Sequence, residues 1–352
     1  SLNENTTGSF NTAIGSQALE KNTTASYNTA VGFNALNRNT TSYNTALGYY
    51  SLFHNTTGNF NTALGTLTLR NNTVGENNCA VGFKSLNALA PSSINNGKQN
   101  TAIGSRVLEK LTSGVDNTAI GFSSMFESGS VSGNTGTGSY SLYNNTGNNN
   151  TAFGYDTLKK KTAGNENTAC GYSSLHGQTG SVGDYNTGIG ARSLKNYTTG
   201  NDNVAVGYQA GDAITTGSNN IIIGSGADAS AAGATNQIVI GKGVTGIANN
   251  YVTIGDASIT NWVSSTNDQA ELGSTGRRFK KLHVNKIDVG EEDTTSDVLL
   301  YLKNPSTGSS THIILDCNQS SKNYLQLGAT LNNNRIYSRK INDHGHTLEV
   351  PL

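Results

Sequence analysis

The chain has 352 residues, and its content of 42 Gly against 3 Pro, 1 Met and 1 Trp is unusual for a globular domain. Its 23 basic and 23 acidic residues give a net charge of zero, so we expect no nucleic-acid partner. No apolar segment approaches the ~20 residues needed to cross a bilayer, so we expect no membrane insertion. The chain begins at Ser1 rather than at Met, which favours an excised or processed segment.

A short motif, first seen as Asn-Thr-Ala-Ile-Gly at residues 11–15, recurs through most of the chain. Its glycines are Gly15, Gly32, Gly48, Gly65, Gly82, Gly104, Gly121, Gly138, Gly154, Gly171, Gly190, Gly207, Gly224, Gly241 and Gly255. The usual step is 16 or 17 residues, and longer steps before Gly104 and Gly190 indicate loop insertions. Such positional order excludes a disordered linker and predicts stacked, equivalent turns.

Each motif predicts a short strand. Thr12 and Ile14 lie on one face and Ala13 on the other, and this alternation predicts a parallel strand buried on both faces. A leucine four residues after most of the motif glycines, first Leu19, marks a second segment, for which we expect another short strand with the leucine in the interior. The predicted fold is an all-β parallel β-roll, or β-solenoid, over residues 1–262, with about 17 residues per repeat. Fifteen turns of about 4.8 Å give a rod roughly 70 Å long.

A thin roll can bury only one face of its sheet within one chain. The second face carries an apolar column of its own, and association around a symmetry axis would cover that column. We therefore expect a homotrimer. A monomeric solenoid with an exposed alanine stripe remains the alternative.

The segments NTAIGSQAL, NTAVGFNAL and NQIVIGKGV resemble the head repeats of trimeric autotransporter adhesins. They equally resemble the shaft repeats of tail fibres of phages and large viruses. The resemblance covers about residues 1–255 and implies a left-handed roll packed three around an axis.

Beyond Gly211 the leucine column disappears, and we expect the roll to close with a cap near Trp262. A connector follows over residues 263–293. Its segment LGSTGRRFKKLHV resembles a stretch that precedes a self-cleaving intramolecular chaperone in phage tail fibres and spikes. This resemblance implies a virion tail fibre whose chaperone has been removed or lies outside the chain.

The last part of the chain, residues 294–352, loses the repeat but keeps strand-like alternation, for example in RIYSRKI. We expect a small C-terminal β-domain that forms the tip. Because a domain of this size gains stability from copies of itself, packing as a trimer suits it.

The expected function is structural and adhesive: a viral fibre segment that attaches to a host-surface glycan or protein receptor by multivalent contact. No nucleophile elbow, phosphate-binding loop or metalloprotease motif is present, so we expect no enzyme. Two alternatives remain. One is the head of a bacterial trimeric adhesin at the cell surface, and the other is a tail-spike depolymerase whose carboxylates meet only between subunits.

Several residues are candidates for receptor contact. A basic group in the connector can bind phosphate or an acidic glycan, or can simply be solvated, and Tyr324 and Tyr337 add two aromatic candidates in the tip. The basic residues are Arg277, Arg278, Lys280 and Lys281. His344 and His346 alternate, so three copies would place six imidazoles around one axis, a possible octahedral site for iron or another divalent metal.

Three further patterns belong to the repeat. Aromatic residues that directly follow the motif glycine predict a ring ladder at a corner, with sugar stacking as the functional alternative. They are Phe33, Tyr49, Phe83, Phe122, Tyr155, Tyr172 and Tyr208. Asn-Thr-Thr at Asn5, Asn22, Asn39 and Asn55 matches the glycosylation pattern, but its recurrence favours a side-chain ladder. The three cysteines, Cys79, Cys170 and Cys317, form no disulfide or zinc pattern, and we expect small buried side chains.

Overall fold

A computed structural model describes residues 1–87, 97–160, 163–256, 258, 337–341 and 347–351 of the chain. The chain divides into two units, Ser1–Val263 and Ser264–Leu352. In the second unit the described elements are β16 (Tyr337–Ile341) and β17 (Thr347–Pro351), which pair antiparallel.

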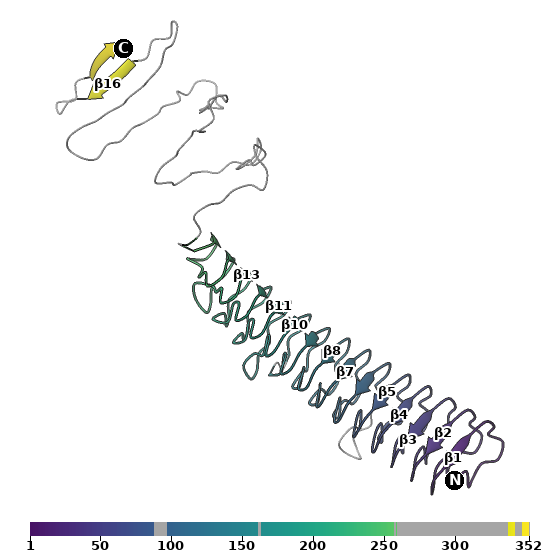
Figure 1. Cartoon of the computed structure of the whole chain (residues 1–352). Coiled ribbons are helices and arrows are strands. Elements are labelled where there is room, and N and C mark those ends of the chain that lie inside the picture. The colour runs from purple at the N-terminus through teal and green to yellow at the C-terminus, as the bar shows by residue number, and fades with distance from the viewer. Residues whose placement is uncertain (88–96, 161–162, 257, 259–336, 342–346, 352) are drawn as a thin grey trace, which may run out of the picture. The chain divides into compact units, whose positions relative to one another are not determined.

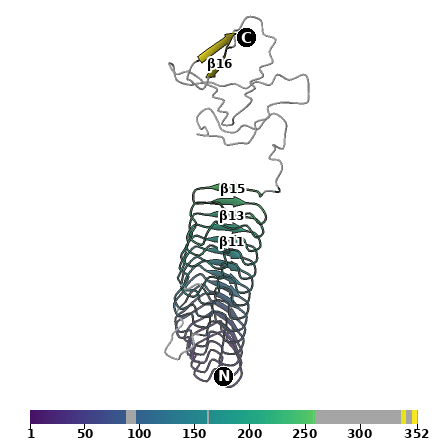
Figure 2. The same cartoon turned by 90° about the vertical axis from the view of Figure 1, so that its left-hand side faces the viewer.

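The first unit is a parallel β-solenoid with one three-residue strand in each turn. Its strands are β1 (Thr12–Ile14), β2 (Thr29–Val31), β3 (Thr45–Leu47), β4 (Thr62–Leu64), β5 (Cys79–Val81), β6 (Thr101–Ile103), β7 (Thr118–Ile120), β8 (Thr135–Thr137), β9 (Thr151–Phe153), β10 (Thr168–Cys170), β11 (Thr187–Ile189), β12 (Val204–Val206), β13 (Ile221–Ile223), β14 (Ile238–Ile240) and β15 (Val252–Ile254). They form one 15-stranded sheet in sequence order and so bound about 14 turns (Figures 1 and 2). The predicted all-β solenoid with repeats of about 17 residues is confirmed, and the described residues contain no helix.

The register of the sheet follows the sequence motif without slippage. Thr12 pairs with Thr29, and after the first insertion Cys79 still pairs with Thr101. The second insertion leaves Thr168 paired with Thr187. Extra residues therefore lie in loops that do not disturb the sheet.

The leucine segment is a tight turn rather than the second strand that we expected. Asn34 and Leu36 have positive φ values of 58° and 49°, and the same conformation recurs at the equivalent positions of most turns. Left-handed residues interrupt an extended segment, so no strand forms there. The backbone still bonds between turns, since Leu36 N–H donates to Ser51 O at 3.0 Å.

The core contains two columns, the leucines and the strand alanines. Leu36, Ala30 and their equivalents in other turns are fully buried. The leucines lie in the interior, as predicted. The prediction that the strand is buried on both faces is wrong for a single chain: Ala faces inward, while Thr and the branched residues face outward, with Ile14 60% exposed and Ile120 36% exposed.

The core changes composition where the leucines end. Gly211 occupies the leucine position with a φ of 66°, and beyond it the inward residue of the strand grows from Ala205 to Ile222 and Val239. Ile222 and Val239 are fully buried. A larger strand residue thus fills the volume that the leucine vacates, which keeps the interior packed. The described turns end near Ile254, so the predicted cap at Trp262 lies outside the described residues.

The motif glycines stack directly on each other. Gly121 has a φ of 129°, and a Cβ at this position would lie 2.7 Å from both C and O of Gly138 in the next turn. Only glycine combines this backbone conformation with so close an approach of the next turn. This stack explains why the motif glycine is retained in every turn.

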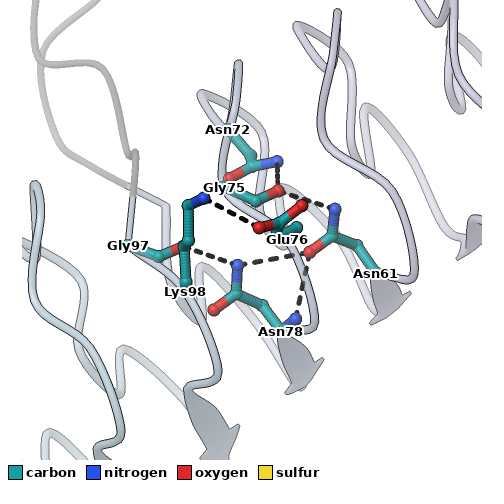
Figure 3. A network of polar contacts seen from close by, with 7 residues as sticks. All are labelled: Asn61, Asn72, Gly75, Glu76, Asn78, Gly97 and Lys98. Carbon is teal, nitrogen blue, oxygen red and sulfur yellow. Dashed lines mark hydrogen bonds and ion pairs between the residues drawn. The ribbon is translucent and has the colours of Figure 1, made fainter.

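A buried asparagine ladder runs beside the sheet, and sequence analysis did not identify its role. Asn78 N–H donates to Asn61 Oδ1 at 3.1 Å, and Asn78 Nδ2 donates to Gly97 O at 2.7 Å (Figure 3). Asn61 Nδ2 donates likewise to Gly75 O at 2.8 Å. The column runs from Asn28 to Asn220 and is almost completely buried. Each amide therefore satisfies backbone groups that the narrow roll removes from water.

A second ladder contains the asparagines of the Asn-Thr-Thr segments. Asn55 Nδ2 donates to Asn39 Oδ1 at 2.8 Å, and Asn72 Nδ2 donates to Asn55 Oδ1 at 2.8 Å. Asn22, Asn39 and Asn55 are fully buried. The interpretation of this pattern as a ladder is confirmed, and these buried amides are not accessible to glycosylation.

Candidate interaction surfaces

The outer sheet face consists of the first and third residues of β1–β15. Its third position is mostly a large apolar residue, and many of these are exposed. The exposed ones are Ile14, Leu47, Leu64, Ile103, Ile120, Phe153, Ile189, Ile223 and Ile254. Thr137 of β8 interrupts this column, but monomeric proteins rarely expose an apolar stripe of this length.

A ring ladder, which sequence analysis missed, borders the outer sheet face at the start of the strands. Phe10, Tyr27, Tyr43 and Phe60 stack in sequence order with ring centroids 4.9 to 5.1 Å apart. Each of them directly precedes the asparagine of the buried ladder. The recurrence of an aromatic residue at this one position of the repeat was the signal that could have predicted the ladder. The rings cover each other's faces and leave their edges in solvent.

The aromatic column after the motif glycine forms a ladder only in part. Phe33 and Tyr49 stack with centroids 5.7 Å apart, and Tyr155 and Tyr172 stack at 5.9 Å. Elsewhere small residues such as Thr66 interrupt the column. The predicted corner stacking is thus confirmed for these two pairs, and the rings remain 40 to 49% exposed in Phe33, Tyr155 and Tyr172 and 51% in Tyr49.

The next corner carries pairs of residues three apart in the chain. Within one turn Asn37 Nδ2 donates to Asn34 Oδ1 at 3.0 Å, and in another Tyr50 packs against Phe53 at 4.8 Å. Further pairs are Arg106 with Glu109, Tyr140 with Tyr143, Asp156 with Lys159 and Gln209 with Asp212. Complementary residue types at this spacing were the available signal, and sequence analysis did not use it.

One group at this corner combines cations with rings, and it is called here the basic aromatic cluster: Arg38, Tyr50, Phe53, His54 and Arg70. The guanidinium of Arg38 lies 5.3 Å from the Phe53 ring centre, and that of Arg70 lies 5.4 Å from the Tyr50 ring centre. His54 packs edge-on against Phe53 at 4.5 Å. Burial, followed by the charges of Arg38 and Arg70, lowers the pKa of His54.

The cysteines lie on or beside the outer sheet face, contrary to the prediction that they are buried. Cys79 opens β5 and is partly exposed, while Cys170 ends β10 and is exposed. Cys79 stands in the Thr column and Cys170 in the Ile column, and both columns point outward. The prediction of buried cysteines therefore failed for the same reason as the prediction that both strand faces are buried. Cys317 lies outside the described residues.

The predicted site residues of the second unit stay predictions. Arg277, Arg278, Lys280, Lys281 and Tyr324 fall outside the described residues, as do His344 and His346. Tyr337 is the first residue of β16, and its backbone pairs with Pro351. Within the described residues no group of three or more His, Cys, Asp or Glu side chains could hold a metal.

Two carboxyl groups meet near the C-terminal end of the roll. Ala213 N–H donates to Asp228 Oδ2 at 3.0 Å, and Gln209 Nε2 donates to Asp212 Oδ2 at 3.2 Å. Burial, with a smaller contribution from Asp212, raises the pKa of Asp228 to about 6. The folded chain therefore takes up a proton here more readily than the unfolded chain does.

This raised pKa predicts a pH-dependent stability. Because the folded pKa exceeds the unfolded one, the favourable contribution is complete below about pH 4 and is lost as the pH rises through about 6. Asp228→Asn keeps an oxygen for Ala213 N–H and removes the charge, so the variant should melt a few degrees above the wild type at pH 7.5. Melting curves from pH 4 to 8 check this, with the difference vanishing at the acid end. A gain of equal size at every pH would contradict it.

Comparison with protein families finds no family model that matches the chain, and comparison with curated proteins finds no significant match. Among the described residues there is no helix with the length and apolarity that a membrane crossing requires.

Proposed function

We propose that this chain is a structural and adhesive segment of a viral tail fibre, which assembles as a homotrimer in the virion and attaches to a glycan or protein receptor on the host surface. The observation that carries the proposal is the outer sheet face, whose apolar column at the third strand position runs along the 15-stranded sheet and is interrupted by Thr137 of β8. The sequence resemblance to fibre shafts and adhesin heads supports the same conclusion.

The size of the outer sheet face suits an interface between copies. Three residues of about 3.3 Å across and fourteen steps of about 4.8 Å give a strip of roughly 700 Å². Specific protein interfaces bury about 800 Å² on each partner. The ring ladder that begins with Phe10 and Tyr27 extends the strip at the edge where the strands begin.

The roll also suits a shaft. Its turns are bonded through the backbone, through two asparagine ladders and through the glycine stack, so each turn holds the next in one register. Three such shafts on a common axis would present three receptor sites together. Multivalent contact then gives strong attachment from sites that are individually weak.

Ile120→Lys tests the interface. Ile120 is already exposed in one chain, so the substitution should leave the fold intact and convert a trimer to monomers, because three buried ammonium groups would face one another. Light scattering coupled to size exclusion measures the mass. Thr216→Lys, on the exposed part of the turn away from the sheet, is the matched control and should remain trimeric. A wild-type chain that stays monomeric at micromolar concentration would overturn the proposal.

Cys170 provides a second readout of the same interface. Its thiol should react slowly with a thiol reagent in the wild-type assembly and rapidly in Ile120→Lys. A cysteine introduced at exposed Ser130 should react rapidly in both proteins. Equal rates at Cys170 in the two proteins would place the interface elsewhere.

The two alternatives are separable by experiment. Shortened chains after incubation with capsule or lipopolysaccharide would indicate a depolymerase. Sequence on either side of this segment distinguishes a fibre, with its chaperone domain, from an autotransporter, with its membrane anchor.

A further inference from the structure

The part of the roll that carries the basic aromatic cluster contains no acidic residue. Between Glu20 and Glu76 the sequence has neither Asp nor Glu, but it has Arg38, His54 and Arg70. The insertion at residues 88–96 adds none, since it reads ALAPSSINN. This is a local positive charge in a chain whose net charge is zero.

Neither arginine of the cluster forms an ion pair within the described part of the chain. Burial and then both guanidinium groups lower the pKa of His54, and Arg38 also acts on Lys21. The nearest carboxylate in the chain, Glu20, is bonded to Asn37 at 2.9 Å. Arg38 is exposed and Arg70 is half-buried, with its Nε shielded from solvent and without a hydrogen-bond partner. Two turns separate the residues, about 10 Å along the roll.

A second ring cluster further along the roll is built alike but is neutralised. Phe126 has Arg106 4.6 Å and Lys110 5.2 Å from its ring centre. Arg106 bonds to Glu109 at 2.6 Å, and Lys110 bonds to Glu127 at 2.6 Å. The cations of this cluster are therefore neutralised by acidic residues of the chain. The arginines of the basic aromatic cluster form no ion pair among the described residues.

Two exposed rings, Phe33 and Tyr49, lie next to the basic aromatic cluster. Phe33 and Tyr49 stack on each other, but the column continues with Ser16 on one side and Thr66 on the other. Tyr50 of the cluster packs edge-on against both rings, and Phe33 and Tyr49 remain 40% and 51% exposed. A sugar ring has an apolar face of C–H groups and a polar rim of hydroxyl groups. It therefore packs well on a flat aromatic ring that has hydrogen-bond donors beside it.

We propose that the basic aromatic cluster, with Phe33 and Tyr49, binds a carboxylate-bearing saccharide. The guanidinium groups of Arg38 and Arg70 hold carboxylates through charge-assisted hydrogen bonds, and the rings receive the apolar face of a sugar. The site lies on the shaft rather than on the tip, and each copy of the chain carries a complete one. Only two arginines are present, fewer than the phosphate contacts that give nucleic-acid binding its strength.

The test uses three probes on the wild-type chain: a short oligogalacturonate, its neutral methyl ester, and acetate. Isothermal calorimetry should detect the oligogalacturonate, with affinity that falls as salt is raised, and should detect neither of the others at the same concentration. Binding should also raise the pKa of His54, which an NMR titration of its ring protons measures. Acetate binding as strongly as the oligosaccharide would identify a simple anion site and overturn the saccharide assignment.

The double variant Arg38→Gln/Arg70→Gln should lower the affinity for the oligogalacturonate by about tenfold or more. The matched control is Lys110→Gln, in the neutralised cluster, which should bind as the wild type does. Tyr49→Ser should weaken binding without changing its salt dependence. The proposal is wrong if the double variant binds unchanged, if no acidic oligosaccharide binds at millimolar concentration, or if an oligothymidylate of equal charge binds more tightly.

This site deepens the proposed attachment function, and its biological meaning rests on that function. The two fail separately, however, because the saccharide site lies within one chain. A wild-type chain that is monomeric yet binds oligogalacturonate would refute the trimer alone, while a trimeric wild type whose binding is unchanged in Arg38→Gln/Arg70→Gln would refute only this site.

Discussion

Gly121→Ala is expected to lower the melting temperature by about 10 °C or more, or to prevent the central turns from folding. The added Cβ would lie 2.7 Å from backbone atoms of Gly138, in a conformation with φ of 129°. Strain of this kind costs about 1 to 3 kcal/mol by itself. The clash adds to it, since the next turn cannot move away without breaking the sheet. Circular dichroism during heating measures the effect.

Two other glycines separate the causes. Gly129 has open space around its Cβ position and no positive φ, so Gly129→Ala should be close to neutral. Gly243 has a φ of 68° in open space, so Gly243→Ala should show the cost of the backbone conformation alone, about 1 kcal/mol. If all three variants have the same melting temperature, the glycine stack has no role in holding the turns together.

Asn117→Ala is the second large expected effect, a loss of about 3 to 5 kcal/mol. Asn117 Oδ1 accepts from Asn134 N–H at 3.1 Å, and its Nδ2 donates to Val131 O at 2.7 Å and to Asn100 Oδ1 at 2.9 Å. Asn117 is fully buried, so its removal leaves backbone groups without partners and without water. Chemical denaturation measures the loss, and hydrogen exchange should localise it to Asn134 and its neighbours.

The matched control is an asparagine that makes a similar bond at the surface. Asn148 Oδ1 accepts from Ser132 N–H at 2.8 Å, but Asn148 is exposed, so water replaces the lost acceptor in Asn148→Ala. The expected cost is about 1 kcal/mol or less. Equal costs for Asn117→Ala and Asn148→Ala would show that burial does not set the value of this ladder.

The candidate surfaces show how far sequence reasoning extends to sites. The aromatic column after the glycine was visible because it recurs at one phase of the repeat. The basic aromatic cluster was not, because it joins Arg38, Phe53 and Arg70 from three turns and from two positions of the repeat. Contacts between turns at a corner depend on how tightly the backbone folds there. Of the two left-handed positions at this corner, one is nearly always leucine, but the other varies, for example Asn34, Tyr50 and Arg106.

The sequence by itself determined the repeat, its register and the buried leucines, because equivalent residues in stacked turns must occupy equivalent places. It also showed that the two faces of each strand differ, but not which face is inside. Only the tertiary structure decided that, through the width of the interior. Leu36 and its equivalents fill the narrow lumen, so the strand opposite can place nothing larger than alanine there; where the leucine is lost at Gly211, Ile222 enters instead. The larger branched residues are consequently turned outward, and they form the surface on which the proposed assembly depends.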